Sequence, residues 1–150
     1  MKVQEGRIGR TFFVTFENGE DLLGETIDLA RKKGIHTALV ILLGAMRTGG
    51  MVVGPRECTV PPVGMERNFN DGREILAIGT IVSDENGEPT LHLHGAAGRG
   101  EHSLTGCLRK DCEVYLIIEG VIMEMEGIKA RRLMDPVLQL KTLVLGKDLA

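Results

Sequence analysis

The spacing of apolar residues changes twice within the first third of the chain, and this change constrains the fold more than any other feature. Between residues 7 and 16, aromatic and β-branched side chains alternate with other positions, as in a β-strand with two different faces. From residue 20 to residue 33 the period becomes helical, because Leu23 and Ile27 lie at i and i+4. Residues 35–46 then form a nearly continuous apolar run, typical of a central strand covered on both faces.

The helical segment carries signals at both of its ends. Glu20 and Asp21 lie at the start, the run Arg31-Lys32-Lys33 occupies the last turn, and Gly34 follows where a left-handed residue often ends a helix. The helix dipole therefore explains the basic run, and we do not interpret it as a nucleic-acid site.

The rest of the chain predicts strands and turns. Residues 55–72 are irregular or an edge element, residues 84–87 form a hairpin turn, and residues 138–145 alternate and could close a sheet edge. Four further segments have strand character; they are residues 75–82, 90–94, 103–108 and 113–123. One helix packed on a mostly antiparallel sheet is the α+β class.

Length and composition limit the functions to consider. The 150 residues, 43% of them hydrophobic and without an internal repeat or linker, predict one domain over residues 1–150. A net charge of −3 and a pI near 5.8 argue against tight non-specific binding of DNA. Three cysteines without a CxxC pair favour a reducing, cytoplasmic location over a disulfide framework.

The sequence predicts neither export nor membrane insertion. Residues 1–6 are polar and are followed by Arg7 and Arg10, without the apolar region of a signal peptide. The longest apolar run, residues 38–46, is about half the ~20 residues that span a bilayer.

Two histidines lie on one face of a predicted strand. His92 and His94 are separated by one residue, so both imidazoles leave the same face, with Cα atoms ~6.5–7 Å apart. His102 follows after the glycine-rich segment 95–100, and a chain reversal there would bring it to the same ion. Three protein ligands with an open fourth position are typical of a catalytic zinc site.

Spacing alone leaves a plainer alternative open. In this alternative His92 and His94 lie on a solvated sheet face, and His102 is a loop residue. Cys107 and Cys112 are interpreted as buried apolar residues rather than ligands, because free cysteine is among the most buried residue types.

An ordered series of motifs over roughly residues 7–135 resembles the PPC domain. This is the plant and prokaryote conserved domain, which follows AT-hooks in plant nuclear proteins and stands alone in bacteria and archaea. The motifs are Gly19-Glu20-Asp21-Leu22, an apolar strand ending at Gly44, Arg73-Glu74-Ile75-Leu76, Gly79-Thr80-Ile81, Leu91-His92-Leu93-His94, His102 and Cys112-Glu113-Val114.

The resemblance implies a stand-alone, prokaryotic PPC-like domain in which a helix packs on an antiparallel sheet and three copies form a homotrimer. It maps the family's three histidines onto His92, His94 and His102, and so implies a site for zinc or another divalent metal. It also implies a regulatory role associated with DNA binding. The same arrangement is similar to the zinc site of acetolactate decarboxylase, which implies an alternative function as a metal-dependent lyase or hydrolase on a small-molecule substrate.

The chain departs from the family pattern at three places. Gly100-Glu101 precedes His102 after a short loop, where family members usually have Gly-Gly after a slightly longer one. The Phe of the family's Gly-Arg-Phe-Glu-Ile element is missing before Glu74. Gly98-Arg99-Gly100 lacks the proline and basic neighbours of an AT-hook, so direct DNA binding would need another surface.

If the metal ion is catalytic, a nearby carboxylate has to move protons. Glu74 and Glu113 are the catalytic candidates, although both also have ordinary roles at strand ends. The sequence therefore leaves enzyme activity open among three hypotheses: a metal-binding regulatory trimer, a small-molecule enzyme, and a structural trimer with surface histidines.

Overall fold

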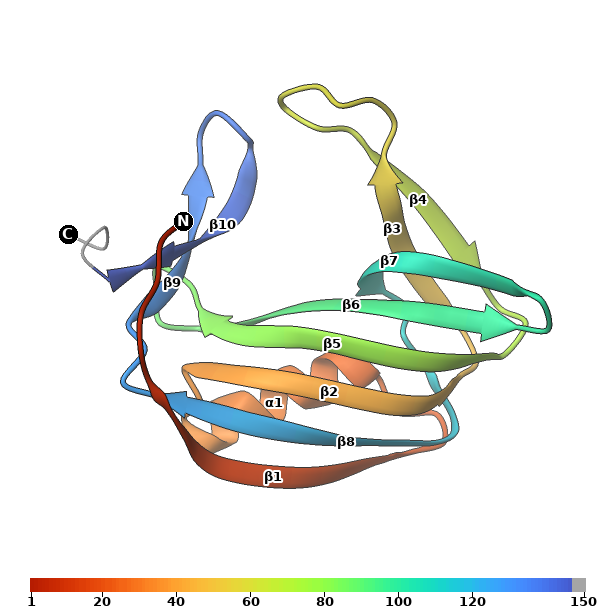
Figure 1. The fold of residues 1–150 in the computed structure, drawn as a ribbon. Helices are drawn as coiled ribbons and strands as arrows, with labels where there is room; N and C mark the ends of the chain where they lie inside the picture. Colours follow the sequence, from red (N-terminus) through yellow and green to blue (C-terminus); the bar gives the residue numbers. More distant parts are fainter. Residues whose placement is uncertain (147–150) are drawn as a thin grey trace.

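The computed structural model describes residues 1–146 as one helix, one large sheet and a separate hairpin (Figure 1). The large sheet contains β1 (Arg7–Glu17), β2 (Thr37–Met46), β3 (Gly49–Pro55), β4 (Gly64–Phe69), β5 (Arg73–Ser83), β6 (Pro89–Arg99), β7 (His102–Lys110) and β8 (Val114–Glu126). The helix is α1 (Leu22–Lys33), and the hairpin pairs β9 (Ala130–Asp135) with β10 (Leu140–Leu145).

The strands of the large sheet lie in the order β1-β8-β2-β5-β6-β7-β3-β4, and all neighbours are antiparallel. The predicted combination of one helix with a mostly antiparallel sheet is confirmed. None of the helices within residues 1–146 has the length and apolar character that a membrane span requires.

The C-terminal signal of α1 acts as the sequence predicts, whereas at its start Asp21 is the N-cap before Leu22 and not a residue of the first turn. The backbone N–H of Leu23 donates to the Asp21 side chain at 3.2 Å, so Asp21 caps the first turn. Gly34 ends the helix with a left-handed φ of 62°, and its N–H reaches the carbonyls of the last turn.

The core lies between α1 and one face of the sheet. Leu22 of α1, Val40 and Leu42 of β2, and Ile118 and Ile122 of β8 are completely buried. Burial of each such side chain contributes ~1.5–3 kcal/mol to folding. The alternation predicted for β1 and the apolar run predicted for β2 both serve this one core.

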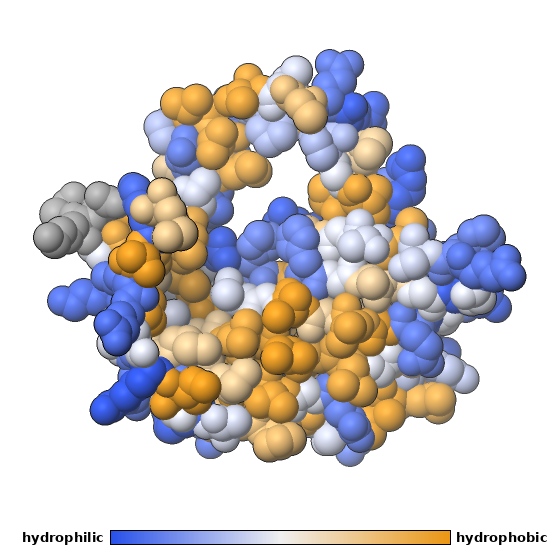
Figure 2. All heavy atoms as spheres, viewed as in Figure 1, coloured by the Kyte–Doolittle hydropathy of each residue, from blue (hydrophilic) through white to orange (hydrophobic). Residues whose placement is uncertain are grey.

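The other face of the sheet is not covered within the chain. We call this surface the apolar sheet face; Leu43 on it is 51% exposed, Leu76 is 64% exposed, and Ile78 is 56% exposed. Leu43 and Leu76 are direct cross-strand neighbours, so they belong to one continuous patch, and apolar residues gather there in Figure 2. The prediction that residues 35–46 are covered on both faces is therefore wrong for the single chain.

Two hairpins rise at opposite ends of β5 and β6: β9–β10 at one end and β3–β4 at the other (Figure 1). Figure 2 shows open space between them, with hydrophilic side chains along its floor. The expectation that residues 138–145 close an edge of the main sheet is wrong, because β10 pairs only with β9. Residues 64–69, within the irregular segment, form the edge strand β4.

Candidate metal centre

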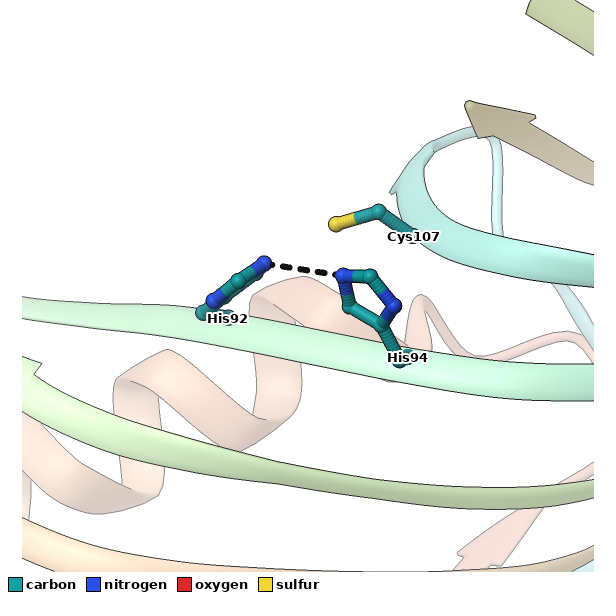
Figure 3. A group of neighbouring side chains, drawn as sticks. All are labelled: His92, His94 and Cys107. Atoms are coloured by element: carbon teal, nitrogen blue, oxygen red, sulfur yellow. Dashed lines mark hydrogen bonds between the residues drawn. The ribbon is translucent and has the colours of Figure 1, made fainter. Parts of the chain in front are cut away.

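His92 and His94 project together from the same face of β6, as their spacing predicts (Figure 3). Their Nε2 atoms are 3.0 Å apart, so one ring donates a hydrogen bond to the other. The ring centroids are 4.8 Å apart and the planes meet at 81°. Both nitrogens therefore point into one small volume.

The third side chain at this place is Cys107 of β7. The register of β6 and β7 places His94 directly opposite Cys107. The ligand atoms of His92, His94 and Cys107 all lie within 4.8 Å of one another. Figure 3 shows the sulfur of Cys107 directed toward the two imidazoles.

The structure does not bring His102 to this group. His102 opens β7 opposite Arg99 and is exposed, whereas Cys107 lies five residues further along the strand, a distance of ~16 Å. The predicted loop over residues 95–100 does not exist, because β6 continues to Arg99. Only Gly100 and Glu101 form the turn, and this short turn fixes His102 at the far end of the hairpin.

Cys107 was missed because a lone cysteine in an apolar setting is usually structural. The sequence did contain a usable signal in Gly100-Glu101. A two-residue hairpin turn at that point pairs residue 99 with residue 102, and counting back along both strands pairs His94 with Cys107. A longer loop, as the glycines suggested, gives another register and hides the pairing.

The surroundings keep the imidazole of His92 neutral. Burial lowers the pKa of His92 to about 4, and the positive charges of Arg132, His94 and Arg109 add to the effect. A neutral imidazole has a free lone pair at neutral pH, which is the form that binds a metal ion.

The thiol of Cys107 is protonated in the absence of a metal. Its pKa is raised by burial, which outweighs the opposing influence of Arg109 and Arg132. Because thiolate is the form that binds metal, a metal ion at this place has to displace the thiol proton.

The donor set fits a zinc ion. Two imidazole nitrogens and one sulfur are common zinc ligands, and bond lengths of ~2.0–2.3 Å at tetrahedral angles place such donors ~3.3–3.6 Å apart. The present spacing, within 4.8 Å, needs only small side-chain movements to reach that geometry. No fourth His, Cys, Asp or Glu joins the group within residues 1–146, so a fourth position would be open.

The two catalytic candidates lie away from this group. Glu74 pairs with Gly98, four residues along β6 from His94, which corresponds to ~13 Å. Glu113 accepts a hydrogen bond from Arg47 at 2.8 Å, in an ion pair outside the histidine strand. Neither carboxylate borders the His92, His94 and Cys107 cluster.

The fold and the cluster define a class of protein: a small antiparallel α+β domain with a His/Cys group on the sheet face opposite the helix. The family follows from the sequence profile of the Plants and Prokaryotes Conserved (PCC) domain, which matches residues 3–126. The chain therefore belongs to this family, the PPC domain of the resemblance above. No curated protein sequence matches it significantly.

Solved structures confirm the fold. A metal-containing protein from Archaeoglobus fulgidus is 24% identical with a TM-score of 0.84, covering 96% of this chain and 99% of its own. A plant- and prokaryote-conserved protein from Pyrococcus horikoshii is 24% identical with a TM-score of 0.81, covering 94% and 96%. A candidate DNA-binding protein from Ralstonia eutropha JMP134 is 20% identical with a TM-score of 0.71, covering 89% of each chain.

Proposed function

We propose that this protein is a homotrimeric, cytoplasmic PPC-domain protein that binds one divalent metal ion, zinc, per chain. The observation that supports this proposal most directly is that the ligand atoms of His92, His94 and Cys107 all lie within 4.8 Å of one another. The Archaeoglobus protein, whose description names it metal-containing, supports the proposal through its similar fold. His92 and His94 keep the role expected from sequence, and Cys107 takes the place proposed for His102.

Elemental analysis of untagged protein tests the metal site. We expect about one zinc per chain after purification without chelators, since three protein ligands hold zinc tightly. Metal-free protein that does not take up zinc or cobalt at stoichiometric concentration would contradict the proposal. It would leave the structural trimer with surface histidines as the remaining hypothesis.

The apolar sheet face supports the trimer. Leu43, Leu76 and Ile78 form a continuous patch of a kind that monomeric proteins rarely leave exposed at large size. The patch extends toward the metal centre, because Ile78 of β5 is directly opposite His94 of β6. Assembly through this face would therefore enclose the surroundings of the metal ion.

The biological role that we propose is regulatory, in association with DNA-binding functions rather than through the duplex itself. The link to DNA-binding functions comes from the Ralstonia protein, which has a similar fold and is described as a candidate DNA-binding protein. The net charge of −3 of the present chain argues against a broad phosphate-binding surface. A gel shift at physiological salt tests this. We expect no shift at micromolar protein with any duplex, and a shift would assign direct DNA binding.

A second candidate is a metal-dependent lyase or hydrolase, favoured by the open fourth position of the ligand set. A bound zinc ion there would polarise an oxygen of the substrate or activate water. Glu74 and Glu113 are too distant to move protons at this place in one chain. Release of CO2 from 2-hydroxy-2-methyl-3-keto acids by zinc-loaded protein would favour the enzyme, and its absence would favour the regulatory role.

A further inference from the structure

Arg132 of β9 is the one buried cationic side chain within residues 1–146, with 9% of its surface exposed. Its Nη2 donates to the hydroxyl of Thr80 at 2.9 Å. Its Nε–H is buried and has no acceptor among the described residues. Because buried N–H groups are nearly always hydrogen-bonded, this one indicates a missing partner.

Arg132 lies next to the proposed metal centre. Thr80 of β5, which it contacts, is directly opposite His92 of β6 in the antiparallel register. Side chains in such a pair have Cβ atoms ~4.5–5.5 Å apart and share one face of the sheet. The guanidinium group therefore sits on the histidine face of the sheet, beside His92.

A second arginine approaches the same place from β7. Arg109 is two residues after Cys107, and alternate residues of a strand share a face. Arg109 and Arg132 both contribute to the lowered pKa of His92, after the larger effect of burial. Two positive charges thus flank the His92, His94 and Cys107 cluster.

These two charges lack a balancing carboxylate. Within residues 1–146, no Asp or Glu forms an ion pair with Arg132 or Arg109. A bound divalent ion would add two positive charges, against a single negative charge from the thiolate of Cys107. Arg109 is exposed, but Arg132 is buried, and a buried charge is costly unless it is paired; the site therefore calls for an anion beside Arg132.

We propose that Arg132 binds the carboxylate of a small-molecule ligand at the metal centre. The inference rests on the proposed function, because it assigns a ligand class to the same site. The planar guanidinium fork matches a carboxylate or a phosphate. The buried Nε–H lacks an acceptor, and the planar fork places an Nη–H beside it, so that the pair matches the two oxygens of one carboxylate.

The surroundings of the cluster also support a small-molecule ligand. The histidine face lies below the open space between the two hairpins, where Figure 2 shows a hydrophilic floor. Arg132 reaches this space from the β9–β10 hairpin, which borders it on one side (Figure 1).

Cobalt-loaded protein provides the test, because the visible spectrum of Co²⁺ changes when an anion enters the metal's surroundings. We expect 2-hydroxyisobutyrate to change this spectrum saturably. Arg132→Gln should weaken the apparent affinity about tenfold to a hundredfold while the bound cobalt per chain stays unchanged. Arg131→Gln is the matched control, since Arg131 is adjacent on β9 and points to its other face; it should behave as wild type.

The outcomes separate the two proposals. Absence of any cobalt spectrum in the wild type would refute the metal centre itself. Normal cobalt binding without an effect of 2-hydroxyisobutyrate, or with the same affinity in Arg132→Gln, would overturn only the carboxylate assignment. An Arg132-dependent response to inorganic phosphate that is stronger than the response to carboxylate would overturn it as well.

Thermal unfolding of metal-loaded protein gives a second readout. Arg132→Met removes an uncompensated buried charge, so in buffer without carboxylates it should leave the Tm equal to or above that of wild type. Addition of 2-hydroxyisobutyrate should then raise the Tm of wild type but not that of the variant. A Tm lowered by the substitution in anion-free buffer, together with equal shifts on addition, would assign Arg132 a purely structural role.

Discussion

His94 of β6 lies directly opposite Cys107 of β7 in the antiparallel register of the sheet. Directly opposite side chains have Cβ atoms ~4.5–5.5 Å apart, which is short enough for both to bind one ion. The length of the turn at Gly100 and Glu101 sets the register between β6 and β7, and this register decides which residue of β7 can be the third ligand. This pairing makes Cys107, and not His102, the residue whose substitution should decide metal binding.

Cys107→Ala should reduce zinc affinity by more than about a hundredfold, since loss of a direct ligand exceeds the ~10–100-fold cost of losing an outer-shell partner. Cys107→His should retain zinc because it supplies another zinc donor. Competition with a coloured chelator measures both affinities, and circular dichroism checks that the variants are folded.

His102→Ala and Cys58→Ala are the matched controls for this prediction. Both residues are exposed and lie outside the cluster, so each variant should bind zinc as wild type does. Zinc loss in His102→Ala with retention in Cys107→Ala would reverse the ligand assignment.

Ile78→Glu should dissociate the trimer, because it places a charge in the centre of the apolar sheet face, where the side chain is 56% exposed in the single chain. Light scattering after size-exclusion chromatography should give the mass of one chain, 16.3 kDa, for the variant and three times this mass for wild type. Val60→Glu, at a 62% exposed position in the loop between β3 and β4, is the control and should remain trimeric. A monomeric wild type, or a trimeric Ile78→Glu protein, would contradict assembly through this face.

The elements that the sequence predicted best are those with a strong local period. The end of α1 follows from Gly34, its start lies two residues after the predicted Glu20, and the strands on both sides of residues 84–87 follow from their strand character and the hairpin turn. The apolar run of β2 was predicted to be covered on both faces, but one face is exposed in the single chain. The sequence does not tell whether a second apolar face is covered by the same chain or by another.

The candidate site was predictable only in the part that depends on local geometry. The shared face of His92 and His94 follows from the two-residue period of a strand. The third ligand depends on the register between β6 and β7, which the sequence analysis got wrong. It interpreted the glycines of residues 95–100 as a loop, whereas most of this segment lies within β6. Arg132 was beyond sequence reasoning, because β9 reaches the site through tertiary packing against β5.

Gly79→Ala should destabilise the protein by about 1–3 kcal/mol and weaken zinc binding, because overpacking displaces neighbouring backbone. A Cβ at Gly79 would meet the backbone carbonyl of His92 and would lie 2.8 Å from the Cα of Leu93. The strand that carries the histidines would have to move. Urea unfolding and zinc titration measure the two effects.

Gly98→Ala on β6 is the matched control for Gly79→Ala. A Cβ there would meet only the backbone carbonyl of His102, at 4.0 Å, so both stability and zinc affinity should stay near wild type. Equal losses in the two variants would mean that close backbone approach at Gly79 is not the cause.

The ion pair between Arg10 of β1 and Glu124 of β8 should make stability depend on pH. Arg10 Nε donates to Glu124 at 2.6 Å, and this hydrogen bond is the main cause that lowers the pKa of Glu124 below its ordinary value of 4.5. A carboxyl group with a lowered folded-state pKa stabilises the fold above its unfolded-state pKa, and the contribution disappears as the pH falls through the folded-state value.

Arg10→Gln should therefore lower the free energy of unfolding slightly at pH 7, because solvent screens a pair whose Arg10 side chain is 51% exposed. The difference from wild type should shrink as the pH falls below the folded-state pKa of Glu124, and the part that remains comes from the hydrogen bond of Arg10 to the Lys33 carbonyl. Urea unfolding at a series of pH values and one fixed protein concentration measures it. Arg7→Gln is the control and should have the smaller effect at pH 7, since Arg7 and its partner Glu126 are 82% and 42% exposed. A difference for Arg10→Gln that persists unchanged into acid would show that Arg10 stabilises the sheet through packing and not through its charge.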